Sequence, residues 1–168
     1  ALNANGVDCK IDATPQSLYL GDPLKCTLPN TVTVRELTYA DKDRIRKWAN
    51  GKMDGYIQHL LTENHYLDPS VLEYGVFEGD ALIAVAGCYI EEVRGLRLNN
   101  CCNIRFADGK ATDELYRAIF FFVVNDVMDK GVLPFDDLQH GEYAETHGGF
   151  TFGDVGFTIV NWRYDVLK

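Results

Sequence analysis

The segment that most constrains the fold is a glycine-containing turn between an apolar strand pattern and a long apolar helix pattern. It runs from Ile104 to Thr112 and reads IRFADGKAT. The first turn of a helix has backbone N–H groups without partners, and the helix dipole adds partial positive charge there. A glycine and small residues leave such amides uncovered by side chains. The pattern therefore predicts a cradle for phosphate or pyrophosphate and makes a nucleotide-bearing cofactor the first hypothesis.

The composition indicates a single acidic globular domain. The chain has 168 residues, of which 46% are hydrophobic, and its formal net charge is −9 at pH 7. Nucleic-acid binding needs clustered Lys and Arg, so the acidic balance argues against a DNA or RNA partner. It fits an amine-bearing or cationic partner, and it equally fits a surface that is acidic only for solubility.

The cysteines and the apolar runs bear on compartment and metal binding. The five cysteines include no CxxC pair, which argues against a zinc site or a thioredoxin-like site. Cys88, Cys101 and Cys102 lie in apolar runs typical of a core, whereas a bridge between Cys9 and Cys26 stays open. No apolar run approaches the ~20 residues that cross a bilayer, and the start has no signal-peptide pattern. We expect a cytoplasmic protein without a membrane partner or a bound metal.

Strand and helix patterns alternate along most of the chain. Residues 1–30 are rich in Asn, Asp, Pro and Gly and predict an extended arm, which docks either on the domain or on a neighbouring copy in a homo-oligomer. Residues 31–168 are the expected domain. Its patterns predict a strand at 31–37, helices at 38–50 and 53–63, a hairpin with strands at 73–77 and 81–90, a strand at 97–106, a helix at 112–130, a strand at 132–138, a short helix at 141–147 and a hairpin at 150–155 and 158–167. This mixed order predicts an α/β (α+β) sheet with helices on both faces.

Three local motifs, in this order, resemble the GCN5-related N-acetyltransferase (GNAT) superfamily. Residues 75–87, GVFEGDALIAVAG, are similar to the family's hairpin, in which a short acidic turn precedes an apolar strand that ends in glycine. Gly109-Lys110-Ala111, before a helix that carries Leu115, is similar to the end of the family's Q/R-x-x-G-x-G/A cofactor motif. Residues 144–150, AETHGGF, are similar to the family's short helix that ends in Gly-Phe.

The resemblance covers residues 32–168 and implies both a fold and an activity. The implied fold is a mixed, mostly antiparallel central sheet of about seven strands, with helices on both faces and a splayed central strand pair. The implied activity is acetyl transfer from the acetyl-CoA thioester to an amine of a small molecule or a protein. The implied cofactor site comprises Arg105, Phe106 and the backbone of Asp108, Gly109, Lys110 and Ala111, with the Lys110 ammonium adding charge.

The implied chemistry also needs a base for the amine and an acid for the leaving thiolate. Candidate bases are carboxylates near the splayed strands, and candidate acids lie near the short helix. The alternative for each carboxylate is a solvated charge at a strand end, and for the histidine it is a turn residue. The candidates are Glu91, Glu92, Asp136 and Asp137 as bases, with Glu91 preferred, and Tyr143 and His147 as acids.

Two positions depart from the family pattern and support a second hypothesis. The family places Gln or Arg three residues before its first glycine, where this chain has Phe106, with Arg105 one position earlier. Its short helix often carries Tyr four residues before its glycine, where this chain has Glu145, with Tyr143 two residues earlier. The alternative is thus an inactive GNAT-fold binding or structural module, for example in a viral or other assembly. A flavin or nucleotide protein that uses Gly109 is a weaker alternative, because the GxGxxG spacing is missing.

Overall fold

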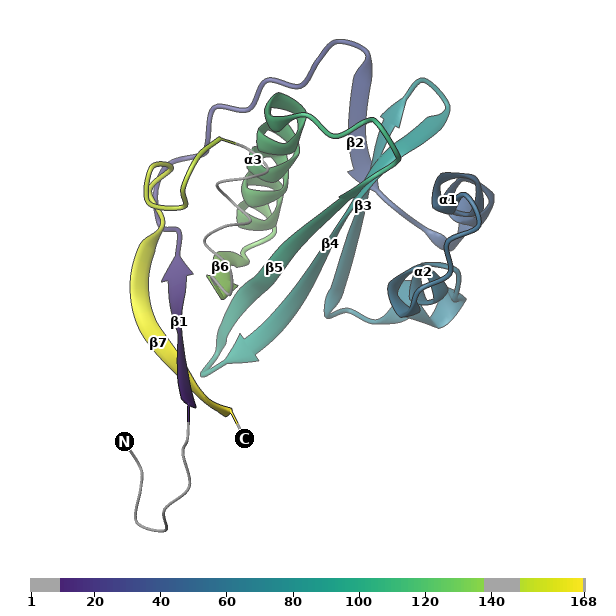
Figure 1. Cartoon of the computed structure of the whole chain (residues 1–168). Helices are drawn as coiled ribbons and strands as arrows, with labels where there is room; N and C mark the ends of the chain where they lie inside the picture. Colours follow the sequence, from purple (N-terminus) through teal and green to yellow (C-terminus); the bar gives the residue numbers. More distant parts are fainter. Residues whose placement is uncertain (1–9, 138–148, 168) are drawn as a thin grey trace.

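Seven strands form one sheet in the order β2-β3-β4-β5-β6-β1-β7 (Figure 1). The computed structural model describes residues 10–137 and 149–167. The strands are β1 (Lys10–Leu18), β2 (Val32–Glu36), β3 (Val71–Glu78), β4 (Ala81–Val93), β5 (Leu96–Phe106), β6 (Leu133–Asp137) and β7 (Thr158–Leu167). The helices are α1 (Lys42–Ala49), α2 (Gly55–Leu60) and α3 (Asp113–Asp129), with short 3-10 helices η1 (Tyr39–Asp41) and η2 (Glu63–Leu67).

The sheet is mixed but mostly antiparallel, as predicted. β5 and β6 pair in parallel, whereas the other neighbouring pairs are antiparallel. The parallel pair follows from chain order, because α3 lies between β5 and β6 and returns the chain to the same end of the sheet. The single parallel pair therefore lies near the middle of the sheet, with antiparallel strands on either side.

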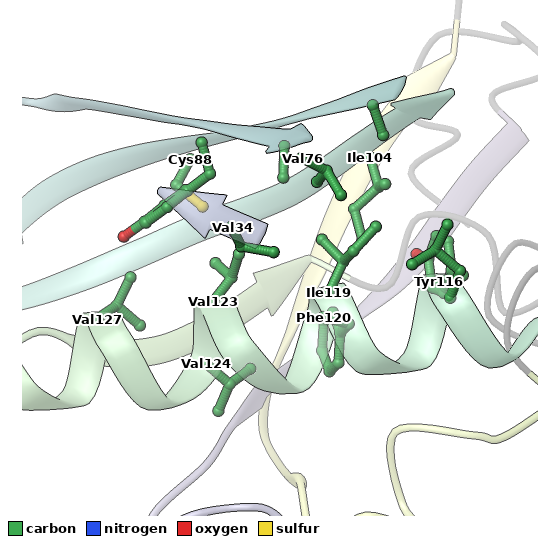
Figure 2. Packing of buried hydrophobic residues seen from close by; sticks show 14 of the residues in the cluster. Val34, Val76, Cys88, Ile104, Tyr116, Ile119, Phe120, Val123, Val124 and Val127 are labelled. Atoms are coloured by element: carbon green, nitrogen blue, oxygen red, sulfur yellow. The ribbon is translucent and has the colours of Figure 1, made fainter. Parts of the chain in front are cut away.

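Helices cover both faces of the sheet, which confirms the predicted layers (Figure 1). The sheet divides the buried side chains into two clusters. The larger lies between α3 and the sheet and includes Val76, Ile104 and Ile119 (Figure 2). The smaller lies under α1 and α2 and includes Ile45 and Leu60. Each strand in the middle of the sheet thus has apolar side chains on both faces, which explains the near-continuous apolar run of β4.

α3 forms where the sequence predicts it. The Thr112 hydroxyl accepts a hydrogen bond from the Leu115 N–H at 3.2 Å and caps the helix. Side chains at helical spacing, among them Ile119, Val123 and Val127, face the strands (Figure 2). The helix ends at Asp129 with Lys130 as its C-cap, and Gly131 follows with a φ of +70°, which a glycine adopts without steric cost.

The second predicted helix is shorter than expected. The sequence pattern predicts residues 53–63, whereas α2 covers Gly55–Leu60. Its start is fixed by Asp54, whose carboxylate accepts a hydrogen bond from the Ile57 N–H at 2.9 Å. After Leu61 the chain turns into η2, so the apolar periodicity continues although the α-helix has ended.

Part of the expected arm is a strand of the sheet. β1 lies between β6 and β7 and pairs with both. At its start Lys10 pairs with Leu167 of β7, and at its end Leu18 pairs with Phe135 of β6. From there the chain returns over α3, where the Leu24 N–H donates to the Asn125 side chain at 2.8 Å. The segment 1–30 thus contains a strand that docks on the body of the domain.

The predicted strand at 150–155 is wrong. These residues form turns, because the Thr151 N–H donates to the Asp154 carboxylate at 3.0 Å and the Asp154 N–H donates back to the Thr151 hydroxyl at 3.2 Å. Their aromatic side chains pack on α3, with the rings of Phe120 and Phe150 5.4 Å apart. β1 therefore takes the place beside β7 that the sequence assigned to this segment. The short helix predicted at 141–147 lies outside the described residues.

Candidate functional site

β5 and β6 separate to form a fork in the middle of the sheet. β6 pairs with β5 only as far as Asn100, which lies opposite Phe135. Beyond this point β5 continues to Phe106 along β4, whereas β6 continues to Asp137 along β1. The fork has its closed end at Asn100 and its open end at Phe106. This confirms the predicted splayed strand pair.

A β-bulge lies at the closed end of the fork. The register between β4 and β5 shifts after the pair Cys88–Cys102, since the next pair is Tyr89–Asn100. Cys101 is thus the extra residue of β5 and stands opposite no residue of β4. A bulge of this kind leaves main-chain groups outside the ladder and increases the local twist. The bulge at Cys101 thus lies one residue from Asn100, the last residue of β5 that pairs with β6.

The loop at 107–112 joins the open end of the fork to α3. Two hydrogen bonds hold it: the Ala107 N–H donates to the Ile83 carbonyl at 2.8 Å, and the Lys110 N–H donates to the Ala107 carbonyl at 3.1 Å. Gly109 has a φ of +73°, and no atom lies within 4 Å of the position that a Cβ would take. The described part of the chain offers no hydrogen-bond partner to three amides of this loop, those of Asp108, Gly109 and Ala111.

The loop leads into the N-terminus of α3, where the dipole of the 17-residue helix favours negative charge. The Thr112 hydroxyl accepts a hydrogen bond from the Leu115 N–H, so this cap satisfies one of the backbone donors of the first turn. The unpartnered amides of the loop add further donors just before the cap. Together they form a polar, uncovered main-chain surface that suits a phosphate or diphosphate.

Two ion pairs tie the loop to neighbouring elements. The Lys110 ammonium lies 2.6 Å from the Glu78 carboxylate at the end of β3. The Lys52 ammonium, between α1 and α2, lies 2.8 Å from the Asp108 carboxylate. Both pairs are largely exposed, so each contributes at most about 1 kcal/mol to stability. Their main effect is to hold the loop at Asp108 and Lys110 and to neutralise the charges of Lys52 and Lys110.

Comparison with known proteins supports the fold. No model of a protein family matches the sequence, and no curated protein matches it. A GNAT-family acetyltransferase structure from Novosphingobium aromaticivorans has a TM-score of 0.61 at 13% identity, over 99% of this chain and 68% of that chain. A GCN5-related N-acetyltransferase from Kribbella flavida has a TM-score of 0.58 at 12% identity, over 90% of this chain and 56% of that chain. The chain has the GNAT fold.

A third GNAT-fold neighbour is glucosamine-6-phosphate N-acetyltransferase from Arabidopsis thaliana. Its TM-score is 0.50 at 13% identity, over 73% of this chain and 92% of that chain. At these identities the likeness establishes the GNAT fold of the chain.

The GNAT-fold motif position three residues before Gly109 is filled by an aromatic side chain. Phe106 is half-buried and packs against the α3 side of the core. Arg105 lies on the opposite face of β5, where its guanidinium is 2.8 Å from the Asp54 carboxylate and 4.5 Å above the Tyr56 ring. The structure therefore places the Arg105 side chain in a contact with α2.

The predicted proton-transfer residues are only partly brought together. Glu91 and Glu92 are exposed near the end of β4, opposite the part of β5 that precedes the fork. Asp136 and Asp137 belong to β6 just beyond the closed end. The predicted acids, Tyr143 and His147, lie outside the described residues. The structure thus places Glu91 and Glu92 on β4, which is separated from the fork by β5, and the positions of Asp136 and Asp137 on β6.

A cavity of about 750 Å³ opens beside the loop, on the side of α1. Its wall includes Arg44, Lys47 and Trp48 from α1, and Asp108 from the loop. The Trp48 indole N–H is buried and has no hydrogen-bond partner in the part of the chain that the structure describes. The cavity reaches the loop at Ala107 and Asp108 and is large enough for a small molecule.

A buried polar cluster on the α2 side was not among the predicted site residues. Glu73 is 5% exposed, accepts a hydrogen bond from the Tyr56 hydroxyl at 2.7 Å and contacts His65 Nε2 at 2.9 Å. Burial raises the pKa of Tyr56 above its ordinary value, and the Glu73 carboxylate adds to this shift. The signal was present in the sequence, because strand alternation places Glu73 on the same face as the inward Phe77.

Among the described residues, no group of three or more His, Cys, Asp or Glu side chains is arranged to hold a metal ion. Within the same residues, none of the helices combines the length and the apolar character that a membrane span requires.

Proposed function

We propose that the protein is an acetyl-CoA-dependent N-acetyltransferase that moves an acetyl group from the CoA thioester to an amine of a small molecule or a protein. The observation that carries the proposal is the set of three unpartnered amides at the open end of the fork, those of Asp108, Gly109 and Ala111. They precede the N-terminus of α3, where a diphosphate is favoured. When bound, acetyl-CoA would supply the activated acetyl group.

The fork gives the rest of the cofactor a path. The pairing of β6 with β5 ends at Asn100, and we place the amides of a pantetheine arm along β5 between this point and Phe106. The bulge at Cys101 adds main-chain groups at the closed end, where the thioester would lie. A main-chain N–H there would stabilise the negative charge that develops on the carbonyl oxygen.

The proposed proton transfers use one base and one acid. Glu91 is the proposed base for the acceptor amine, because it is exposed on β4 opposite Leu98, two residues before the closed end of the fork. Tyr143 is the proposed acid for the departing thiolate, with His147 as the second candidate. A deprotonated amine is the nucleophile that acyl transfer requires, so loss of the base would slow turnover rather than cofactor binding.

One observation favours a second function, a GNAT-fold module that binds without turnover. Phe106 fills the motif position where the family has Gln or Arg, and its ring is half-buried in the core. Lys110, the nearest cation, is paired with Glu78. Both features reduce the positive charge at the cradle. A module of this kind would bind CoA or its ester but would release no thiol in the presence of amines.

Calorimetric titration of acetyl-CoA into the wild type and into Gly109→Glu tests the proposal. We expect micromolar or tighter binding by the wild type. The variant should not bind, because a carboxylate at the cradle repels the diphosphate and obstructs the amides. Gly95→Glu is the matched control: Gly95 also has a positive φ and open space around it, but it lies in the β4–β5 turn.

The control separates a local effect from strain. If Gly95→Glu binds like the wild type and Gly109→Glu does not, the cradle is the site. Equal binding by all three proteins would remove the cradle from the mechanism. Thiol release across a panel of primary amines then distinguishes the transferase from the non-catalytic module.

A further inference from the structure

Two buried side-chain oxygen atoms near the closed end of the fork have no hydrogen-bond partner among the described residues. Asn99 of β5 is 3% exposed and Ser17 of β1 is 1% exposed. Among the described residues, nothing donates to the Asn99 Oδ1, and the Ser17 hydroxyl is likewise unpartnered. An unsatisfied buried polar group costs free energy, and native proteins contain few of them. Two such groups in one region therefore call for an explanation.

Both side chains lie on the α3 face of the sheet. Asn99 is directly opposite Ile90, which belongs to the α3 cluster, and directly opposite residues of an antiparallel pair share a face. Ser17 stands two residues before Tyr19, which belongs to the same cluster. The short strand β6 separates them, with Pro134 opposite Asn99. The two orphan groups thus flank β6 beneath an apolar helix.

Their place along the fork matches the far end of a cofactor arm. The closed end and the loop at 107–112 are separated by β5 from Asn100 to Phe106, about 20 Å at the usual rise of a strand. An arm that starts at the loop and follows the edge of β5 therefore ends beside Asn99. This placement rests on the proposed function, since it takes the diphosphate to lie on the loop.

We propose that the Asn99 Oδ1 accepts a hydrogen bond from an N–H or O–H donor at the thioester end of a CoA ester. An acetyl group carries neither, so it would leave this acceptor unsatisfied. A hydroxylated acyl chain carries the missing donor, and the Ser17 hydroxyl offers a second polar contact in the same layer. An amide N–H of the pantetheine arm is the alternative donor to the Asn99 Oδ1.

Calorimetry with three ligands distinguishes these sources. CoA, butyryl-CoA and 3-hydroxybutyryl-CoA are titrated into the wild type, into Asn99→Leu and into the control Arg97→Leu, an exposed position of the same strand outside the 100–106 stretch. We expect the hydroxylated ester to bind the wild type about tenfold more tightly than butyryl-CoA. Asn99→Leu should abolish that difference, and Arg97→Leu should preserve it.

The other outcomes are equally decisive. If Asn99→Leu weakens all three ligands alike, the donor is the amide of the arm and Asn99 still accepts from it. If the wild type binds the two esters equally and Asn99→Leu changes nothing, the assignment of Asn99 is overturned while the cradle stands. If the wild type binds no CoA derivative, both proposals are overturned.

A stability measurement tests the unpartnered state without any cofactor. Replacing an orphan polar group by an apolar one is neutral or stabilising, so Ser17→Ala and Asn99→Leu should leave the urea midpoint unchanged or raise it. The control is Tyr74→Phe, since the Tyr74 hydroxyl is buried and donates to Asp126 at 2.7 Å. It should lower the midpoint. Destabilisation by Asn99→Leu as large as that of the control would mean that Asn99 has an internal partner, which overturns the proposal.

Discussion

The Lys110 ammonium and the Glu78 carboxylate lie 2.6 Å apart, which links the loop at 107–112 to the end of β3. The pair is half-exposed on both sides. A diphosphate on the loop would compete with Glu78 for the same cation. Separating Lys110 from Glu78 costs a small free energy, and the ion pair weakens diphosphate binding by that amount.

Replacing Glu78 should tighten cofactor binding. In Glu78→Gln the Lys110 ammonium has lost its carboxylate partner, so we expect acetyl-CoA to bind up to about fivefold more tightly at low salt. The gain should shrink as salt rises, because exposed charges are screened. Titration calorimetry at two salt concentrations measures both effects. Glu92→Gln removes an equal charge from the exposed end of β4 and controls for net charge; a gain as large in this variant would contradict the local explanation.

Asp41 should stabilise the fold in a pH-dependent way. It is 3% exposed and accepts hydrogen bonds from the Arg35 guanidinium at 2.6 and 2.9 Å. These bonds hold the pKa of Asp41 below its ordinary value, against the opposing effect of burial, and the Thr38 N–H adds to the lowering. A carboxyl whose folded pKa is lowered stabilises the protein above its unfolded pKa and loses this contribution as pH falls through the folded value.

The corresponding variant is Asp41→Asn. At pH 7 we expect the free energy of unfolding to fall by about 1–3 kcal/mol, because a charged hydrogen-bond network is broken. The difference from the wild type should decrease as the pH is lowered below about 4. Urea unfolding of both proteins across a pH series measures this. A difference that stays constant down to the acid limit would show that the charge of Asp41 is not responsible.

Gly87 should be required for the packing of α2 on the sheet. A Cβ at this position of β4 would stand 2.7 Å from the Tyr56 hydroxyl and 2.9 Å from the Glu73 carboxylate. We expect Gly87→Ala to destabilise the protein by about 1–3 kcal/mol through overpacking. Gly55→Ala is the control, since nothing lies within 4 Å of a Cβ there. Thermal unfolding should separate the two variants, and equal midpoints would argue against the close approach.

The cap of α3 should matter for stability at the cofactor loop. Thr112→Ala removes the hydroxyl that accepts the Leu115 N–H, and we expect a loss of about 1 kcal/mol in urea unfolding. Thr112→Ser keeps the hydroxyl and should retain most of the stability. If the serine variant loses as much as the alanine variant, the capping hydrogen bond is not the cause.

The sequence predicted the elements whose patterns are local. α3 and the β3–β4 hairpin were found because their apolar periodicity and end signals lie within a few residues of each other. β1 was missed as a strand because its pattern is interrupted by Pro15 and its partner, β7, is more than a hundred residues away. The same sequence separation explains why residues 150–155 were wrongly predicted as a strand: β1, and not this segment, pairs with β7.

The candidate site was predicted through its backbone and missed in its side chains. Gly109 and the N-terminus of α3 identified the loop, because unpartnered amides follow from local geometry. The engagement of Arg105 by Asp54, and of Lys110 by Glu78, depends on which elements meet in space. Asn99 gave no signal, because the sequence does not show which polar side chains the register leaves without partners.

The position of β1 has a consequence for synthesis of the chain. Lys10 faces Leu167, and beyond its three-residue contact with β6 the strand pairs only with β7. During translation β1 can therefore complete its pairing only after β7 has been synthesised. Fragments that end before Thr158 would expose that strand, and such fragments should be bound by chaperones or degraded rather than accumulate as a smaller folded unit.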